Sequence, residues 1–208
     1  MSLFLLGLTG SIGTGKSTTA KMLSRLKLPI FDADRVVHRL LGEDESVIQA
    51  ITELFADCMK EGHVCRAALG NRVAHSKEDL RALEDIIHPR VQGACRAFIS
   101  ECRNNGTPLA VLEIPLLYEK GYDLLCDKVI VTVCQPELQR QRVMARPGMT
   151  QDKFDMICAN QINSPQKAAR ADFVLVTDDG ELATFRGLRH ILTQIRSIEE
   201  SPHAQHCS

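Results

Sequence analysis

The fold is decided at the N-terminus, where residues 3–18 read LFLLGLTGSIGTGKST. An uninterrupted apolar run, residues 3–9, leads into the glycine-rich pattern G-x-x-x-x-G-K-S at residues 10–17. Such a run is typical of a strand buried on both faces of a parallel sheet. A helix is expected from Lys16 to about Leu26, so the sequence predicts a strand, a tight turn and a helix in direct succession.

The turn has the chemistry of a phosphate-binding loop. Glycines let the backbone approach an oxyanion, successive N–H groups form an anion-binding nest, and the helix N-terminus adds partial positive charge. Lys16 is expected to reach the β- and γ-phosphates of a nucleoside triphosphate, and the Ser17 hydroxyl to ligate Mg²⁺ as the cofactor. The residues expected to contact ATP in this loop are Gly13, Thr14, Gly15, Lys16, Ser17 and Thr18.

Four further apolar runs predict the rest of the sheet. They are residues 28–31, 109–114, 128–134 and 173–177. Strands that alternate with helices predict an α/β fold, here a five-stranded parallel sheet flanked by helices. A last helix is expected at about 181–198.

Residues 35–105 carry a helical pattern that is too long for a simple crossover, so we expect an inserted helical lobe. Its two apolar stripes are Val47, Ile48, Ile51, Leu54 and Phe55, and Leu80, Leu83, Ile87, Val91, Ala94 and Phe98. Pro89 lies within the second stripe and is expected to kink or break that helix.

The predicted organisation has four parts. They are a nucleotide-binding core (1–34, 106–137 and 164–200), the helical lobe as an acceptor-binding region (35–105), a helical lid (138–163) and a flexible tail (201–208). The lid is read as two polar helices, 136–147 and 150–163, joined at Pro147–Gly148.

Composition narrows the function classes. The chain has 208 residues, a net charge of −1 and no Trp, which argues against a nucleic-acid partner. No apolar run is long enough to cross a membrane, and the eight Cys contain no C-x-x-C pair. We therefore expect a cytoplasmic protein with free thiols and no membrane partner.

Acidic residues at predicted strand ends are candidates for catalysis. Asp32 and Asp34 follow the second strand, where ligands gather in open α/β sheets. Asp34 is the candidate base for an acceptor hydroxyl, and Asp32 is assigned to acceptor binding, with a helix cap as the alternative for each. Glu113 ends the third strand and is either a water-mediated Mg²⁺ ligand or the partner of a basic neighbour.

Basic residues of the lid are candidates for phosphate binding. Arg142 and Arg146 are spaced i, i+4 and would share a helix face, from which they could clamp the triphosphate. A solvated basic face is the alternative, and we favour it for Arg140. From spacing alone, His88 is more often structural than functional.

Taken together, the segments GLTGSIGTGKST, IFDADRVVH, IIHPRV, EIPLLYE and RVMARPGMT, with Asn160–Gln161, resemble the bacterial dephospho-coenzyme A kinase family over about residues 3–185. The resemblance implies a P-loop kinase core with an acceptor lobe and a lid. It implies ATP-dependent phosphorylation of the ribose 3′-hydroxyl of dephospho-CoA, the last step of coenzyme A synthesis.

The resemblance also implies roles for particular residues. It assigns Asp34 as the base, Arg142 and Arg146 as lid arginines, and His88 and Glu119 to acceptor binding. Two departures are Pro147–Gly148 in the lid and Thr177–Gly180 near the last strand, where relatives often carry an Asn before a Gly, so no adenine contact is assigned there. A kinase for another small alcohol or nucleoside, and a non-catalytic ATP-sensing module, are the alternatives.

Overall fold

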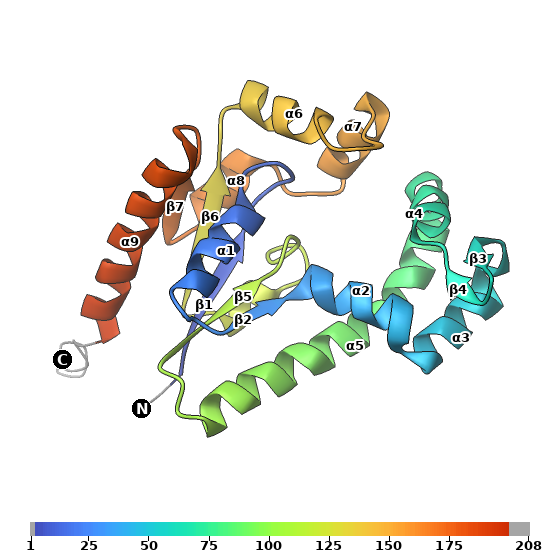
Figure 1. Cartoon of the computed structure of the whole chain (residues 1–208), viewed down its shortest axis with the longest axis horizontal. Helices are drawn as coiled ribbons and strands as arrows, with labels where there is room; N and C mark the ends of the chain where they lie inside the picture. Colours follow the sequence, from blue (N-terminus) through green and yellow to red (C-terminus); the bar gives the residue numbers. More distant parts are fainter. Residues whose placement is uncertain (1–2, 200–208) are drawn as a thin grey trace. The chain divides into compact units, whose positions relative to one another are not determined.

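The computed structural model describes residues 3–199, so the predicted tail at 201–208 lies outside the described residues. The chain divides into two compact units. One unit comprises the chain up to Phe31 together with the chain from Asn105 onward, and the other is Asp32–Asn104 (Figure 1). We refer to them as the sheet unit and the helical unit.

A five-stranded sheet organises the first unit. Its strands are β1 (Phe4–Thr9), β2 (Ile30–Asp32), β5 (Leu109–Glu113), β6 (Lys128–Val133) and β7 (Phe173–Val176). They lie in the order β2-β5-β1-β6-β7, and β1 pairs in parallel with both β5 and β6, as β6 does with β7. The predicted five-stranded parallel sheet is therefore confirmed.

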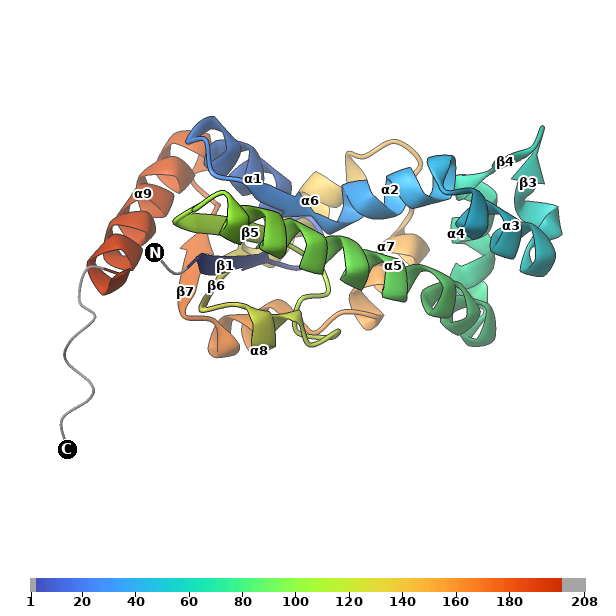
Figure 2. The same cartoon turned by 90° about the horizontal axis from the view of Figure 1, so that it is seen from below.

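The helices of this unit are α1 (Lys16–Arg25), α6 (Pro136–Met144), α7 (Gln151–Ala159), α8 (Ser164–Arg170) and α9 (Gly180–Glu199), with a 3₁₀ turn, η2 (Tyr122–Leu125). Of these, α1, α8 and α9 pack against the strands of the sheet. Figure 2 shows α1 on one face of the sheet and α8 on the opposite face. This double cover explains the apolar run of the first strand, because Leu5, Leu6 and Leu8 are all buried.

The helical unit contains a feature that the sequence pattern did not reveal. Its elements are α2 (Ala33–Glu43), α3 (Glu45–Leu54), η1 (Ala56–Cys58), β3 (Met59–Lys60), β4 (His63–Val64), α4 (Arg66–His75) and α5 (Lys77–Asn104). The helical pattern expected over residues 35–105 was wrong at β3 and β4, which pair in an antiparallel hairpin. Glu61 and Gly62 both have positive φ (51° and 79°), as a two-residue hairpin turn requires.

Pro89 was expected to kink or break its helix, and a break at Pro89 is wrong, because α5 continues through this residue. The Arg90 Nη1 atom donates to the Ile86 carbonyl (3.0 Å) one turn earlier. Leu54 is 55% exposed, although Val47 and Phe55 of the same predicted stripe are buried. Leu54 is the last residue of α3, so the expected apolar stripe was wrong at the final position of the helix.

Within the described residues, no helix is long and apolar enough to cross a membrane. The seven described cysteines are free, as expected, and Cys58, Cys95 and Cys102 are buried in the helical unit. These three act as small core side chains.

Candidate active site

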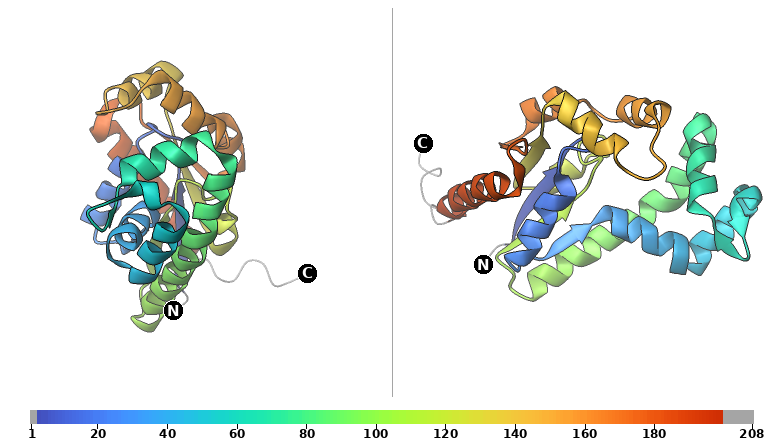
Figure 3. Two further views of the ribbon diagram at one scale, coloured as in Figure 1. Left: turned by 90° about the vertical axis from the view of Figure 1, so that its right-hand side faces the viewer. Right: turned by 45° about the horizontal axis from the view of Figure 1, so that its top comes forward.

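The glycine-rich turn leaves β1 and ends where α1 begins at Lys16. Gly13 and Gly15 have φ of +80° and +93°, which is the left-handed region that favours glycine. A Cβ on Gly13 would lie 2.5 Å from Val143 Cγ2 and 3.0 Å from the Gln139 carbonyl oxygen of α6. The turn is therefore packed directly under α6, at the end of the sheet where α6 and α7 follow one another (Figure 3).

Buried hydroxyl groups fix the turn from within the sheet unit. Thr14 Oγ1 donates to the Ser11 carbonyl (2.8 Å) and lies 2.9 Å from Thr132 Oγ1. Thr177 Oγ1 donates to the Thr14 carbonyl (2.9 Å). The side chain of Thr14 thus supports the turn, so a contact from Thr14 to ATP would come from its backbone.

Lys16 and Glu113 meet at the start of α1. Lys16 Nζ lies 2.7 Å from Glu113 Oε1, and Glu113 is only 5% exposed. This is the ion pair that we had weighed against a metal-binding role for Glu113. A buried carboxylate depends on such a partner, because its desolvation would otherwise be costly.

The same region suits a magnesium ion held with a nucleotide. Among the described residues, no group of three His, Cys, Asp or Glu side chains could hold a metal alone. Mg²⁺ is usually bound by one or two carboxylates together with substrate phosphates, so a dedicated cage is not required. Ser17 is exposed in the first turn of α1, and with Glu113 it supplies oxygen atoms of the right kind.

The predicted lid arginines differ in position. Arg142 lies on α6, where Nη1 donates to Thr177 Oγ1 (2.9 Å) and Nη2 to the Thr177 carbonyl (2.7 Å). Arg146 lies beyond the end of α6 and is exposed. The expectation that Arg142 and Arg146 share a helix face was therefore wrong, because the helix ends at Met144.

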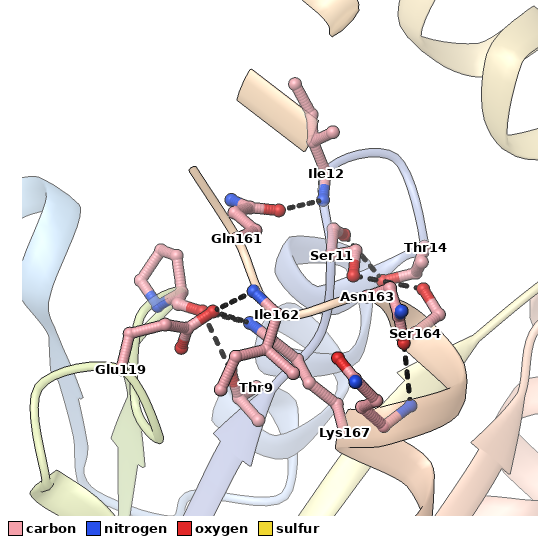
Figure 4. Close-up of polar contacts among 12 residues, drawn as sticks. Thr9, Ser11, Ile12, Thr14, Glu119, Gln161, Ile162, Asn163, Ser164 and Lys167 are labelled. Carbon is pink, nitrogen blue, oxygen red and sulfur yellow. Dashed lines mark hydrogen bonds and ion pairs between the residues drawn. The ribbon is translucent and has the colours of Figure 1, made fainter. Parts of the chain in front are cut away.

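Glu119 belongs to a buried polar cluster that sequence reasoning did not foresee (Figure 4). Its Oε1 atom accepts from the Ile162 N–H (2.8 Å) and pairs with Lys167 Nζ (2.9 Å). Lys167 Nζ also donates to the Pro115 carbonyl (2.8 Å). Burial lowers the pKa of the Lys167 ammonium, while the hydrogen bond and charge of Glu119 raise it.

Two glutamines that we did not assign hold the backbone of the turn. The Ile12 N–H donates to Gln161 Oε1 (3.1 Å), and Gln139 Nε2 donates to the Ile12 carbonyl (2.7 Å). Gln161 belongs to the Asn160–Gln161 pair of the family resemblance, and this pair is the sequence signal for it. No comparable signal marked Gln139 or Lys167.

The remaining predicted residues belong to the helical unit. Asp32 Oδ1 accepts from the Arg35 N–H (2.9 Å), so Asp32 caps α2. A helix cap was the alternative to acceptor binding that the sequence left open for Asp32. Asp34 lies in the first turn of that helix. His88 lies on α5 with its Nε2 atom 2.8 Å from Gln92 Nε2.

A parallel sheet whose first strand passes through a glycine-rich turn to a Lys-Ser helix start defines a P-loop fold, which kinases share with other nucleotide-binding proteins. The solved shikimate kinase of Acinetobacter baumannii has this fold: its TM-score is 0.51 at 19% identity, with 94% of each chain covered. That likeness concerns the fold alone.

Closer matches identify the family. The crystal structure of TT1252 from Thermus thermophilus is 32% identical, with a TM-score of 0.79 over 93% of this chain and 98% of that one. The dephospho-CoA kinase of Rhizobium meliloti is 41% identical over 196 residues, 94% of this chain and 100% of that protein. A family model described as dephospho-CoA kinase matches residues 4–183. The chain belongs to the dephospho-CoA kinase family, and it is a kinase.

Proposed function

We propose that this chain transfers the γ-phosphoryl group of ATP to the 3′-hydroxyl of the dephospho-CoA ribose, giving coenzyme A and ADP. The observation that carries the proposal is the glycine-rich turn at the start of α1, with Lys16 beside it, in a chain that belongs to the dephospho-CoA kinase family. Dephospho-CoA is the acceptor named for the 41%-identical Rhizobium meliloti relative.

ATP binding is assigned to the sheet unit. Backbone N–H groups of the turn and of the first turn of α1 are proposed to bind the phosphates, with Lys16 supplying a charge for the β- and γ-phosphates. Lys16 pairs with Glu113, so nucleotide binding would replace or share this contact. Thr18 follows Ser17 in the same helical turn and is assigned to the phosphates with it.

Mg²⁺ would be held by Ser17, with Glu113 through water, and would neutralise phosphate charge. The protein's own contribution is then positioning and charge stabilisation, since phosphoryl transfer leaves little covalent work for side chains. Arg142 and Arg146 are assigned to the triphosphate as part of a lid, 138–163. For Arg142 this requires exchanging Thr177 for a phosphate oxygen.

Acceptor binding is assigned to the helical unit. Asp34 is proposed to accept the ribose hydroxyl proton, and Asp32 and His88 to hold the acceptor. For Asp32 this role is compatible with capping α2, because the cap bond uses Oδ1 and leaves Oδ2. A cytoplasmic enzyme without a nucleic-acid partner remains part of the proposal.

The test is incubation of the purified chain with Mg·ATP and dephospho-CoA, followed by mass spectrometry for a gain of one phosphate. Asp34→Asn is expected to lower kcat by about 10²–10⁴-fold. Glu45→Gln, which neutralises an acid in the first turn of α3, is the matched control and is expected to leave kcat unchanged. No phosphate gain by the wild-type chain would refute the proposed reaction, and near-normal turnover by Asp34→Asn would refute the base.

A further inference from the structure

We propose that Glu119 and Lys167 are positioning residues that set the phosphate-binding turn through Gln161, and that Glu119 does not contact the acceptor. The resemblance had suggested an acceptor contact for Glu119. This inference deepens the proposed function and rests on it for its kinetic test, whereas nucleotide binding tests it independently.

Glu119 and Lys167 form a buried ion pair in the sheet unit. Lys167 is fully buried, at 0% exposed, and the Glu119 side chain is 14% exposed. The second carboxylate oxygen of Glu119, Oε2, is also buried. A buried ammonium is costly unless it is paired and hydrogen-bonded. Lys167 meets that need with Glu119 and the Pro115 carbonyl, which ties α8 to the chain that follows β5.

Residues 161–164 connect the Glu119–Lys167 pair to the phosphate-binding turn. Glu119 also accepts from the Ile162 N–H, which fixes the backbone next to Gln161. Gln161 in turn accepts from the Ile12 N–H. Two residues after Ile162, Ser164 Oγ lies 3.0 Å from Ser11 Oγ. Ser11 and Ile12 of the turn are thus both bonded to the segment 161–167, and this segment is bonded to Glu119 at Ile162 and at Lys167 (Figure 4).

External support matters because the turn is rich in glycine. Gly10, Gly13 and Gly15 give its backbone many accessible conformations, of which one presents the N–H groups to a phosphate. Bonds to Ile12 select the orientation of its peptide groups before the nucleotide arrives. Preorganisation of this kind lowers the cost of binding, so its loss should weaken triphosphate and diphosphate affinity and leave acceptor affinity alone.

The primary test replaces Gln161 by Met, which has a similar size and no strong acceptor. Gln161→Met is expected to raise the Kd of ATP and of ADP about fivefold to tenfold, as the loss of one such hydrogen bond implies. The KM for dephospho-CoA is expected to stay unchanged. Gln166→Met makes the same change at an exposed position four residues before Arg170 and is expected to alter neither quantity.

The second test separates positioning from acceptor contact. Glu119→Gln keeps an acceptor for the Ile162 N–H but leaves Lys167 buried without a countercharge, so nucleotide affinity is expected to fall. Adding Lys167→Met removes the uncompensated charge, and the double variant is expected to recover most of the affinity. Rescue by a second substitution is not expected of a residue that binds the acceptor directly.

Opposite results would overturn the inference. A Glu119→Gln enzyme with raised KM for dephospho-CoA and normal Kd for ATP would make Glu119 an acceptor contact. A normal Kd in Gln161→Met would show that the turn does not depend on this support, even if Glu119→Gln failed to fold. A wild-type chain that binds ATP but does not phosphorylate dephospho-CoA would refute the proposed reaction and leave the nucleotide-binding test of the inference intact.

Discussion

Substitution of Gly13 by Ala tests how tightly α6 covers the phosphate-binding turn. Two effects add at this position. The residue has φ of +80°, and an L-residue in the left-handed region costs about 1–2 kcal/mol. Its Cβ would also lie 2.5 Å from Val143 Cγ2 and 3.0 Å from the Gln139 carbonyl oxygen. Overpacking of this kind typically costs about 1–3 kcal/mol.

We therefore expect Gly13→Ala to lower the free energy of unfolding by about 2–5 kcal/mol, the sum of the two effects. The matched control is Gly148→Ala. Gly148 has φ of +73°, but a Cβ there would meet no atom within 4 Å. In Gly148→Ala the free energy of unfolding should fall by only about 1–2 kcal/mol, the cost of an L-residue at positive φ. The difference between the two variants isolates the contact with α6.

Urea denaturation provides the free energies, and ATP binding by calorimetry provides the functional consequence. Relief of the clash is tested with Val143→Ala, which removes the nearest atom. The double variant should lose less stability than the sum of the single variants, by about 1 kcal/mol or more. The reasoning is refuted if Gly13→Ala is no less stable than Gly148→Ala, or if the two substitutions at Gly13 and Val143 are additive.

Three further predictions concern other parts of the chain. Lys16→Met is expected to lower turnover at least about 10²-fold. It is also expected to lower the free energy of unfolding, because Glu113 loses its ion pair with Lys16. Kinetics and urea denaturation measure the two effects, and adding Glu113→Gln should restore stability but not turnover. Asp32→Ala is expected to cost about 1 kcal/mol of stability through loss of the α2 cap, whereas Asp32→Asn should retain it; equal losses in the two variants would contradict the cap. Burial raises the pKa of the Cys95 thiol from 9.0 to about 11, so folding favours the protonated thiol. The contribution of this pKa difference to the free energy of unfolding is complete below pH 9 and is lost as the pH rises toward 11. Urea denaturation at pH 7 and pH 10.5 should show a smaller loss in Cys95→Ala than in the wild type, and an equal loss would argue against it.

Much of the sheet unit could be predicted because its signals are local. A buried parallel strand is apolar throughout, and a phosphate-binding turn needs glycines and Lys-Ser at fixed offsets. The predicted strand at 109–114 and the observed β5, Leu109–Glu113, differ by one residue. The helical unit was harder, because the β3–β4 hairpin depends on a two-residue turn whose neighbours carry no strand pattern.

The class of fold, the turn that is expected to hold phosphate, and the family could all be predicted from the amino-acid sequence. These follow from short-range constraints on backbone conformation and from the burial of contiguous residues. The side chains that hold that turn could be identified only in the folded chain. They come from three separate elements: Gln139 from α6, Gln161 from the segment after α7, and Lys167 from α8. The hydrogen bond between Gln161 and Ile12 spans 149 residues, and no periodicity in the sequence indicates it. Such contacts depend on where the sheet brings distant segments together, which is a property of the folded chain and not of any local stretch.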